Sequence, residues 1–179
     1  MQSMFTALLE LLEKPLQPGG GVKTDNSILL VYPPEKELDF REYLLDRFFP
    51  LLKARQMPYD DLDLTGFLFD DLSEKTIQDL QEDEFDDYQW LKQGLAKRVE
   101  LALQQRIATR AAAAPGCTIL VYATVSLYPL VRFGEILRGL RDLHCRTVLA
   151  FPGEEHGGKL HFMNQLDGGN YLAVKLFWR

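Results

Sequence analysis

Two apolar stretches, Thr118-Ile119-Leu120-Val121-Tyr122 and Arg146-Thr147-Val148-Leu149-Ala150-Phe151, decide the fold of this chain. Short continuous apolar runs of this kind are typical of strands that are covered on both faces of a sheet. A helical pattern over residues 127–143 separates them, and a third such run, Ser27 to Tyr32, lies nearer the N-terminus. Apolar strands that alternate with helices predict a parallel sheet with helices on both faces. We therefore expect a three-layer α/β fold.

The remaining elements are predicted from helical spacing and turn residues. Pro50 interrupts the helical pattern of residues 39–55, so a kink or break near Phe49 is expected. Ser3 and Ser126 are the expected N-caps of their helices, and residues 151–154 are expected to form a turn. The other expected elements are helices over 3–13, 73–80 and 85–113, a strand over 62–64, and two strands within 160–177 joined at residues 167–170. We expect a single domain, 1–179, in which residues 1–26 form an N-terminal helix and a Gly-rich link.

Charge is segregated along the chain, whose formal net charge is −6. Residues 57–90 carry 12 Asp or Glu and one Lys, whereas residues 91–179 carry 12 Lys or Arg and 6 Asp or Glu. Blocks of like charge are typical of exposed faces and interaction surfaces. The negative total argues against unaided tight binding to DNA. We therefore hypothesise that the acidic segment contacts a protein partner. The candidate interface residues in it are Asp83, Glu84, Asp86 and Asp87.

No nucleotide-binding or catalytic motif is complete. Residues 19–24 imitate the end of a phosphate loop, but Val22 replaces the glycine before the lysine, and the segment precedes the first strand instead of following it. After Tyr32, where such a loop would lie, Pro33 and Pro34 lack N–H donors. Three or four zinc ligands cannot be assembled, and Gly-x-Ser-x-Gly is absent. We expect no catalytic residue, no cofactor and no metal.

The loops beyond the carboxyl ends of the strands are the expected functional loops of an open α/β sheet. They are compact, polar and rich in proline, which favours a protein contact surface over a reaction centre. The candidate interface residues there are Phe151, Pro152, Gly153 and Glu154.

Two other classes of function stay open. One is a metal-dependent nuclease or phosphohydrolase that uses Glu154 and strand-end acids. The other is nucleic-acid binding by the basic half of the chain. The candidate contacts for this second alternative are Arg132, Arg138, Arg141 and Arg146.

Cysteine content and hydropathy predict a cytoplasmic protein. Cys117 and Cys145 each lie at the edge of a predicted strand and are expected to be reduced thiols in the core. No apolar run reaches the roughly 18–20 residues of a membrane span.

Several motifs resemble those of the BrxB family of bacterial BREX phage-defence systems. The most specific are Phe151-Pro152-Gly153-Glu154 and the run Asp167-Gly168-Gly169-Asn170-Tyr171-Leu172-Ala173-Val174. The strand Ile28 to Tyr32 and the run Leu62-Asp63-Leu64-Thr65 also fit. One departure is the loop of residues 155–159, where relatives carry polar Asn or Tyr residues.

The resemblance implies a small cytoplasmic BREX component with no established catalytic residues. Relatives work alongside PglZ (a protein of the alkaline-phosphatase superfamily), the PglX methyltransferase and the BrxC ATPase. We expect a non-catalytic assembly or adaptor subunit that binds PglZ directly, supports host DNA methylation and phage restriction, and meets DNA only through the complex. We also expect the fold to resemble a degenerate phosphate-loop or AAA-like core without nucleotide motifs.

Overall fold

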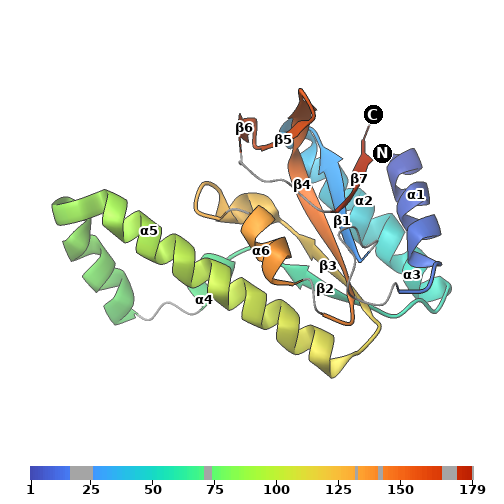
Figure 1. The fold of residues 1–179 in the computed structure, drawn as a ribbon, viewed down its shortest axis with the longest axis horizontal. Helices are drawn as coiled ribbons and strands as arrows, with labels where there is room; N and C mark the ends of the chain where they lie inside the picture. The colour runs from blue at the N-terminus through green and yellow to red at the C-terminus, as the bar shows by residue number, and fades with distance from the viewer. Residues whose placement is uncertain (17–25, 71–73, 132, 141–142, 167–172, 179) are drawn as a thin grey trace.

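The central sheet is parallel and has helices on both faces, as predicted (Figure 1). The computed structural model describes residues 1–16, 26–70, 74–131, 133–140, 143–166 and 173–178. In this part of the chain the parallel strands follow the order β2-β3-β4-β1-β7. Their bounds are β1 Ser27–Tyr32, β2 Tyr59–Asp63, β3 Thr118–Tyr122, β4 Arg146–His156 and β7 Val174–Phe177. Two short strands, β5 (Lys159–Phe162) and β6 (Gln165–Leu166), extend the end of β4 as an antiparallel ribbon.

The apolar strands divide the core into two clusters, one on each face of the sheet. Successive side chains of a strand point to opposite faces. Leu29, Ile119 and Leu149 therefore belong to one cluster, while their neighbours Leu120 and Val148 belong to the other. Both clusters are buried, so the continuous apolar runs in the sequence reflect burial on both faces.

The N-terminal helices cover one face. They are α1 (Gln2–Leu12), the 3-10 turn η1 (Pro34–Lys36), α2 (Glu37–Tyr43), the π-helical turn η2 (Leu44–Phe48) and α3 (Phe49–Ala54). Phe40 stacks on Tyr32 of β1, with ring centroids 4.0 Å apart. The kink or break predicted near Phe49 takes the form of the π-helical turn η2, which leads into α3 without a gap. Pro50 lacks the N–H that would continue the regular helical ladder.

The other face is covered by α5 (Glu74–Ala113) and α6 (Phe133–Gly139), with the short helix α4 (Phe67–Asp70) beside them. A single 40-residue α5 replaces the two predicted helices over 73–80 and 85–113, since no glycine or proline interrupts residues 80–85. Among the side chains of α5 that the structure describes, the buried ones are Val99, Leu103, Ile107 and Ala111, all in its second half. Figure 1 shows the first half of α5 extending away from the sheet. None of the helices in the described ranges is both long and apolar enough to cross a bilayer.

The predicted turn at residues 151–154 is wrong, because β4 continues to His156. Tyr32 of β1 is the last parallel partner of the strand, opposite Pro152. From Gly153 onward β4 pairs antiparallel with β5, beginning opposite Phe162. A strand can change partners here because Pro152 has no N–H to offer a ladder and Gly153 allows a close backbone approach.

The predicted helix over residues 127–143 is confirmed only in part. The chain instead forms the 3-10 turn η3 (Thr124–Leu127) and the shorter α6, with Pro129 between them. Ser126 is an exposed residue inside η3 and does not cap α6. At the N-terminus, Ser3 lies inside α1 and Met1 is the N-cap, without a side-chain cap bond. The predicted turn at residues 167–170 lies outside the described residues.

Candidate functional site

Polar side chains from several elements meet at the carboxyl edge of the parallel sheet. Ligands of open α/β sheets bind beyond this edge. Tyr32, Asp63 and Tyr122 end β1, β2 and β3 there, and the β4–β5 ribbon rises beside them (Figure 1). We therefore take this edge as the candidate functional site.

A polar network joins β1 to the helix that follows it. The Tyr32 hydroxyl donates a hydrogen bond of 2.5 Å to Glu37 Oε2, while Glu37 Oε1 is buried and has no partner among the described residues. Burial raises the pKa of Glu37 above its ordinary value, and Asp63 adds to the rise, whereas the Tyr32 hydrogen bond and Arg41 oppose it. Burial likewise raises the pKa of Tyr32, and the Glu37 charge adds to that rise. These shifts favour the protonated form of each group.

Arg41 extends this network to β2. Its Nη2 lies 3.9 Å from Asp63 Oδ2, and both side chains are partly exposed. The other carboxylate oxygen of Asp63 accepts the Thr65 N–H at 2.8 Å, which is an Asx turn that fixes the end of the strand. The positive charge of Arg41 therefore partly balances the negative charge of Asp63, which belongs to the acidic segment 57–90.

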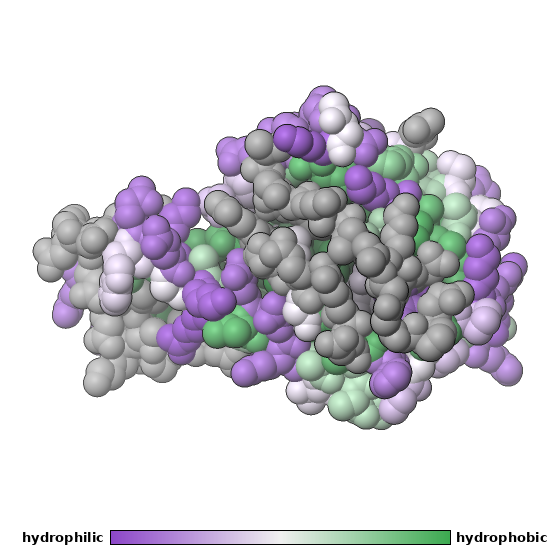
Figure 2. Space-filling model, viewed as in Figure 1, coloured by the Kyte–Doolittle hydropathy of each residue, from purple (hydrophilic) through white to green (hydrophobic). Residues whose placement is uncertain are grey.

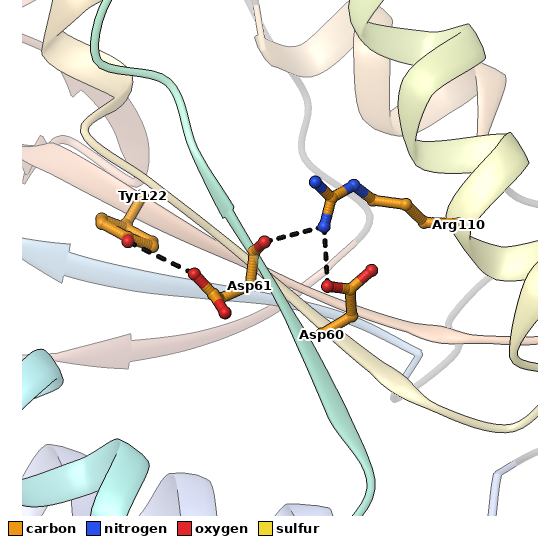
Figure 3. A network of polar contacts seen from close by, with 4 residues as sticks. All are labelled: Asp60, Asp61, Arg110 and Tyr122. Carbon is orange, nitrogen blue, oxygen red and sulfur yellow. Dashed lines mark hydrogen bonds and ion pairs between the residues drawn. The ribbon is translucent and has the colours of Figure 1, made fainter.

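A second network holds β2 from both faces of the sheet (Figure 3). From α5, Arg110 Nη1 donates to Asp60 Oδ1 at 2.6 Å and to the backbone carbonyl of Asp61 at 2.8 Å. From β3, the Tyr122 hydroxyl donates to Asp61 Oδ2 at 3.4 Å. Burial, aided by the charges of Asp63 and Asp61, raises the pKa of Tyr122 to about 12. β2 is an edge strand of the sheet. By binding the Asp61 carbonyl, Arg110 occupies a backbone acceptor of β2 that could otherwise pair with another strand.

A pocket of about 310 Å³ lies at the carboxyl ends of β1 and β7, beside the last residues of β4. One side of the pocket is formed by residues 153–155 of β4, which extends beyond the end of its pairing with β1. Glu154 Oε2 lies 3.1 Å from His156 Nε2, and Glu155 Oε1 lies 3.4 Å from Lys175 Nζ. The lining residues are Val31, Tyr32, Pro33, Gly153, Glu154, Glu155, Phe177 and Trp178.

The chemistry of this edge suits contacts better than phosphate binding. After β1 the chain enters Pro33, Pro34 and a three-residue 3-10 turn. This turn offers few N–H donors for phosphate oxygens. Among the described residues, no three His, Cys, Asp or Glu side chains are arranged to share a metal ion.

The acidic candidates Asp83, Glu84, Asp86 and Asp87 all lie in the first half of α5. In that half the side chains that the structure describes are mostly exposed, including Ile77 at 37% and Trp90 at 70%. Other acids of the same segment face the body of the protein, because Asp60 pairs with Arg110 and Asp70 with Arg106. The acids of α5 therefore form the part of the segment that extends from the body.

The other protein-contact candidates are only partly at the surface. Phe151 is fully buried, and Pro152 and Gly153 are buried as well. They are strand residues of the core, which corrects their placement in an exposed turn. Glu154 is partly exposed and lines the pocket.

Of the four arginines considered for nucleic acid, the structure corrects one. Arg146 is 3% exposed, and its guanidinium donates to the carbonyls of Leu12 at 3.1 Å and Lys14 at 3.0 Å. It therefore fastens the end of α1 to β4, and we no longer expect it to meet phosphate. Arg132 and Arg141 lie outside the described residues, and Arg138 belongs to α6.

Arg41, Arg110 and Trp178 were not predicted as site residues from the sequence. The two arginines lie within helical patterns whose charged residues are ordinarily solvated, and their partners are distant in sequence. The sequence features that could have indicated these ion pairs are the three aspartates of β2 and the arginines in the helices.

Comparison with known proteins gives one family. The family model described as "BREX protein BrxB" matches residues 61–176, well over half of the chain. Among curated proteins, none matches the sequence.

Proposed function

The chain belongs to the BrxB family of BREX proteins, and on this premise we propose that it is a non-catalytic assembly or adaptor subunit of a BREX anti-phage complex. Family membership indicates a role in BREX phage defence. The proposal adds that PglZ is the direct partner, that PglX and BrxC join the same assembly, and that DNA is reached through these components.

The observation that carries the proposal is the first half of α5. Residues 74–90 contain seven acids and one lysine, whereas residues 91–113 contain five cations and one acid. Only the second half supplies buried residues among those described. A helical segment whose described side chains are exposed gains little stability from packing on the rest of the protein, so contact with another protein would account for its length.

The charge order of α5 supports the same role. Acids near the N-terminus and bases near the C-terminus of a helix both complement its dipole. The basic half lies on the body, where Arg106 and Arg110 pair with Asp70 and Asp60. The acidic half contains a single lysine and extends outward from the sheet. Its net negative charge would attract a basic surface of a partner protein at long range.

We further infer that the fold is a degenerate phosphate-loop or AAA-like core. The position of β1, between β4 and the edge strand β7, supports this inference. A phosphate loop follows a strand and opens a helix, and at the corresponding exit this chain has Pro33, Pro34 and Glu35. Such a core would have the parallel sheet of a nucleotide-binding domain without its phosphate loop, and its surface would bind other proteins of the complex.

Co-purification tests the adaptor role. Tagged protein would be purified with its neighbouring BREX components at low and moderate salt, next to a variant in which Asp83, Glu84, Asp86 and Asp87 are changed to Lys. The control reverses the same number of exposed acids on the N-terminal helices and the turn before them, Glu10, Glu35, Glu42 and Asp46. We expect the α5 variant to lose PglZ and the control to retain it. Equal retention by both variants would refute the contact, and absence of any complex with the unchanged protein would refute the adaptor role.

A further inference from the structure

The pocket at the carboxyl ends of β1 and β7, beside the last residues of β4, exists because β4 is longer than its parallel neighbours. Its pairing with β1 ends at Pro152, and Gly153 to His156 continue upward against β5. The backbone pairing with β5 holds this part of β4, and only glycine fits at position 153, since a Cβ there would lie 2.0 Å from the His161 carbonyl oxygen. The opposite wall is fixed by the Trp178 N–H, which donates to the Val31 carbonyl at 2.8 Å. Both walls are therefore held by backbone contacts.

The lining of this pocket disfavours anions. Glu154 and Glu155 both line it, and carboxylates repel phosphate or another acid. Pro33 contributes no N–H. The ends of parallel strands present carbonyl oxygens, which accept hydrogen bonds and do not donate them.

The same lining suits a cation that has a flat, donor-rich head. Glu155 is paired with Lys175, but the partner described for Glu154 is His156, which carries a charge only when protonated. Both glutamates are partly exposed, with 44% and 38% of their side chains accessible. Phe177 and Trp178 provide aromatic residues in the same pocket. Carboxylates beside aromatic rings are the groups that a guanidinium binds, through paired hydrogen bonds and stacking.

We propose that this pocket receives an arginine side chain of a partner protein. Its volume of about 310 Å³ is near the lower end of ligand pockets, which are roughly 300–1,000 Å³, and this suits one side chain with its flanking backbone. The inference rests on the proposed assembly function, and it adds a second contact that is separate in sequence from the acidic half of α5. Figure 2 shows hydrophilic side chains around the tip of the β4–β5 ribbon, whose strand β4 lines one side of the pocket.

The test uses Trp178 as its reporter. The chain has two tryptophans, so Trp90→Phe leaves Trp178 as the only indole. The probes are acetyl-Gly-Arg-Gly-amide, its lysine and citrulline counterparts, and inorganic phosphate. Citrulline keeps the shape of arginine without the charge. We expect a saturable change in Trp178 fluorescence with the arginine peptide at a dissociation constant of about 1–10 mM, weaker binding of the lysine peptide, and none of citrulline or phosphate.

A pair of conservative substitutions locates the binding. Glu154→Gln with Glu155→Gln is expected to weaken the arginine peptide about tenfold, while Glu10→Gln with Glu42→Gln, which removes two exposed charges elsewhere, leaves it unchanged. Equal binding of citrulline, competition by phosphate, or the absence of a saturable change up to about 50 mM peptide would overturn the proposal. So would an unchanged affinity in the pocket variant.

The pocket and the assembly role can fail separately. If the arginine peptide binds but no BREX component co-purifies with the unchanged protein, the pocket stands and the adaptor function fails. If the complex forms while the peptide does not bind, the adaptor function stands and the pocket proposal fails.

Discussion

Arg110 is expected to anchor the long helix to the sheet, and its replacement by methionine tests this directly. In the structure its Nη1 donates to the Asp60 carboxylate at 2.6 Å and to the Asp61 carbonyl at 2.8 Å (Figure 3). Methionine retains much of the aliphatic stem but neither donor. The substitution therefore removes the polar link between α5 and β2 and keeps most of the packing.

The expected cost is moderate. A hydrogen bond to a charged group contributes about 1.5–3 kcal/mol and a neutral one about 0.5–1.5 kcal/mol. Arg110 and Asp60 are 33% and 36% exposed, however, and ion pairs that are accessible to solvent contribute only about 0–1 kcal/mol. We therefore expect Arg110→Met to lower the free energy of unfolding by about 1.5 kcal/mol.

Urea denaturation followed by circular dichroism measures this change. Arg98→Met removes a charge from an exposed position of the same helix and is the matched control. A double-mutant cycle with Asp60→Asn isolates the pair, and we expect a coupling energy of about 1 kcal/mol. The reasoning is refuted if Arg110→Met falls within about 0.3 kcal/mol of the control, or if the cycle shows no coupling.

Three further changes test the carboxyl edge and the core. Gly153→Ala should lower the free energy of unfolding by about 3 kcal/mol, because the new Cβ meets the His161 carbonyl at 2.0 Å; a urea midpoint equal to that of the unchanged protein would contradict this. Arg146→Met should cost about 3 kcal/mol by leaving two carbonyls at the end of α1 without their donor, and faster hydrogen exchange in α1 would locate the loss. Glu37 has a raised pKa in the folded protein, so folding favours its protonated carboxyl. The free energy of unfolding is therefore greatest below the ordinary carboxyl pKa and falls as the pH rises through the raised pKa. Glu37→Gln should therefore raise the melting temperature at pH 7, by a margin that shrinks as the pH falls towards 4; a margin that does not depend on pH would contradict the burial argument.

Much of the sheet could be predicted from the sequence. The strand over 118–122 is found as predicted, and the strand after Pro58 is found a few residues earlier than expected. These predictions succeed because a run of apolar residues has few ways to be buried other than between two layers. The irregular helical turn before Pro50 is also a local effect, since it depends on one missing N–H. Cys117 and Cys145 are both buried, as their positions at the strand edges indicated.

The site was harder to predict, as the candidates around β4 show. Phe151-Pro152-Gly153-Glu154 has the composition of a turn, yet β4 passes through it because β5 supplies a new partner at Gly153. Arg146 is a charged residue and so was considered for nucleic acid, yet its partners lie more than 130 residues away, at the end of α1 and just after it. The residues next to Gly153 and Arg146 in the sequence do not indicate that β5 or the end of α1 will be their partners.

The sequence by itself determined the parallel α/β class, the separation of charge and the family, because each depends on residue type or on spacing along the chain. Only the tertiary structure decided how the charges are used. It joined the acidic and basic segments into one helix, paired Asp60 and Asp63 with Arg110 and Arg41 of the body, and left the first half of α5 to extend from the sheet (Figure 1). The physical reason is that electrostatic pairs and pockets depend on distances in space, and residues 20 to 50 positions apart along the chain meet only when the layers pack.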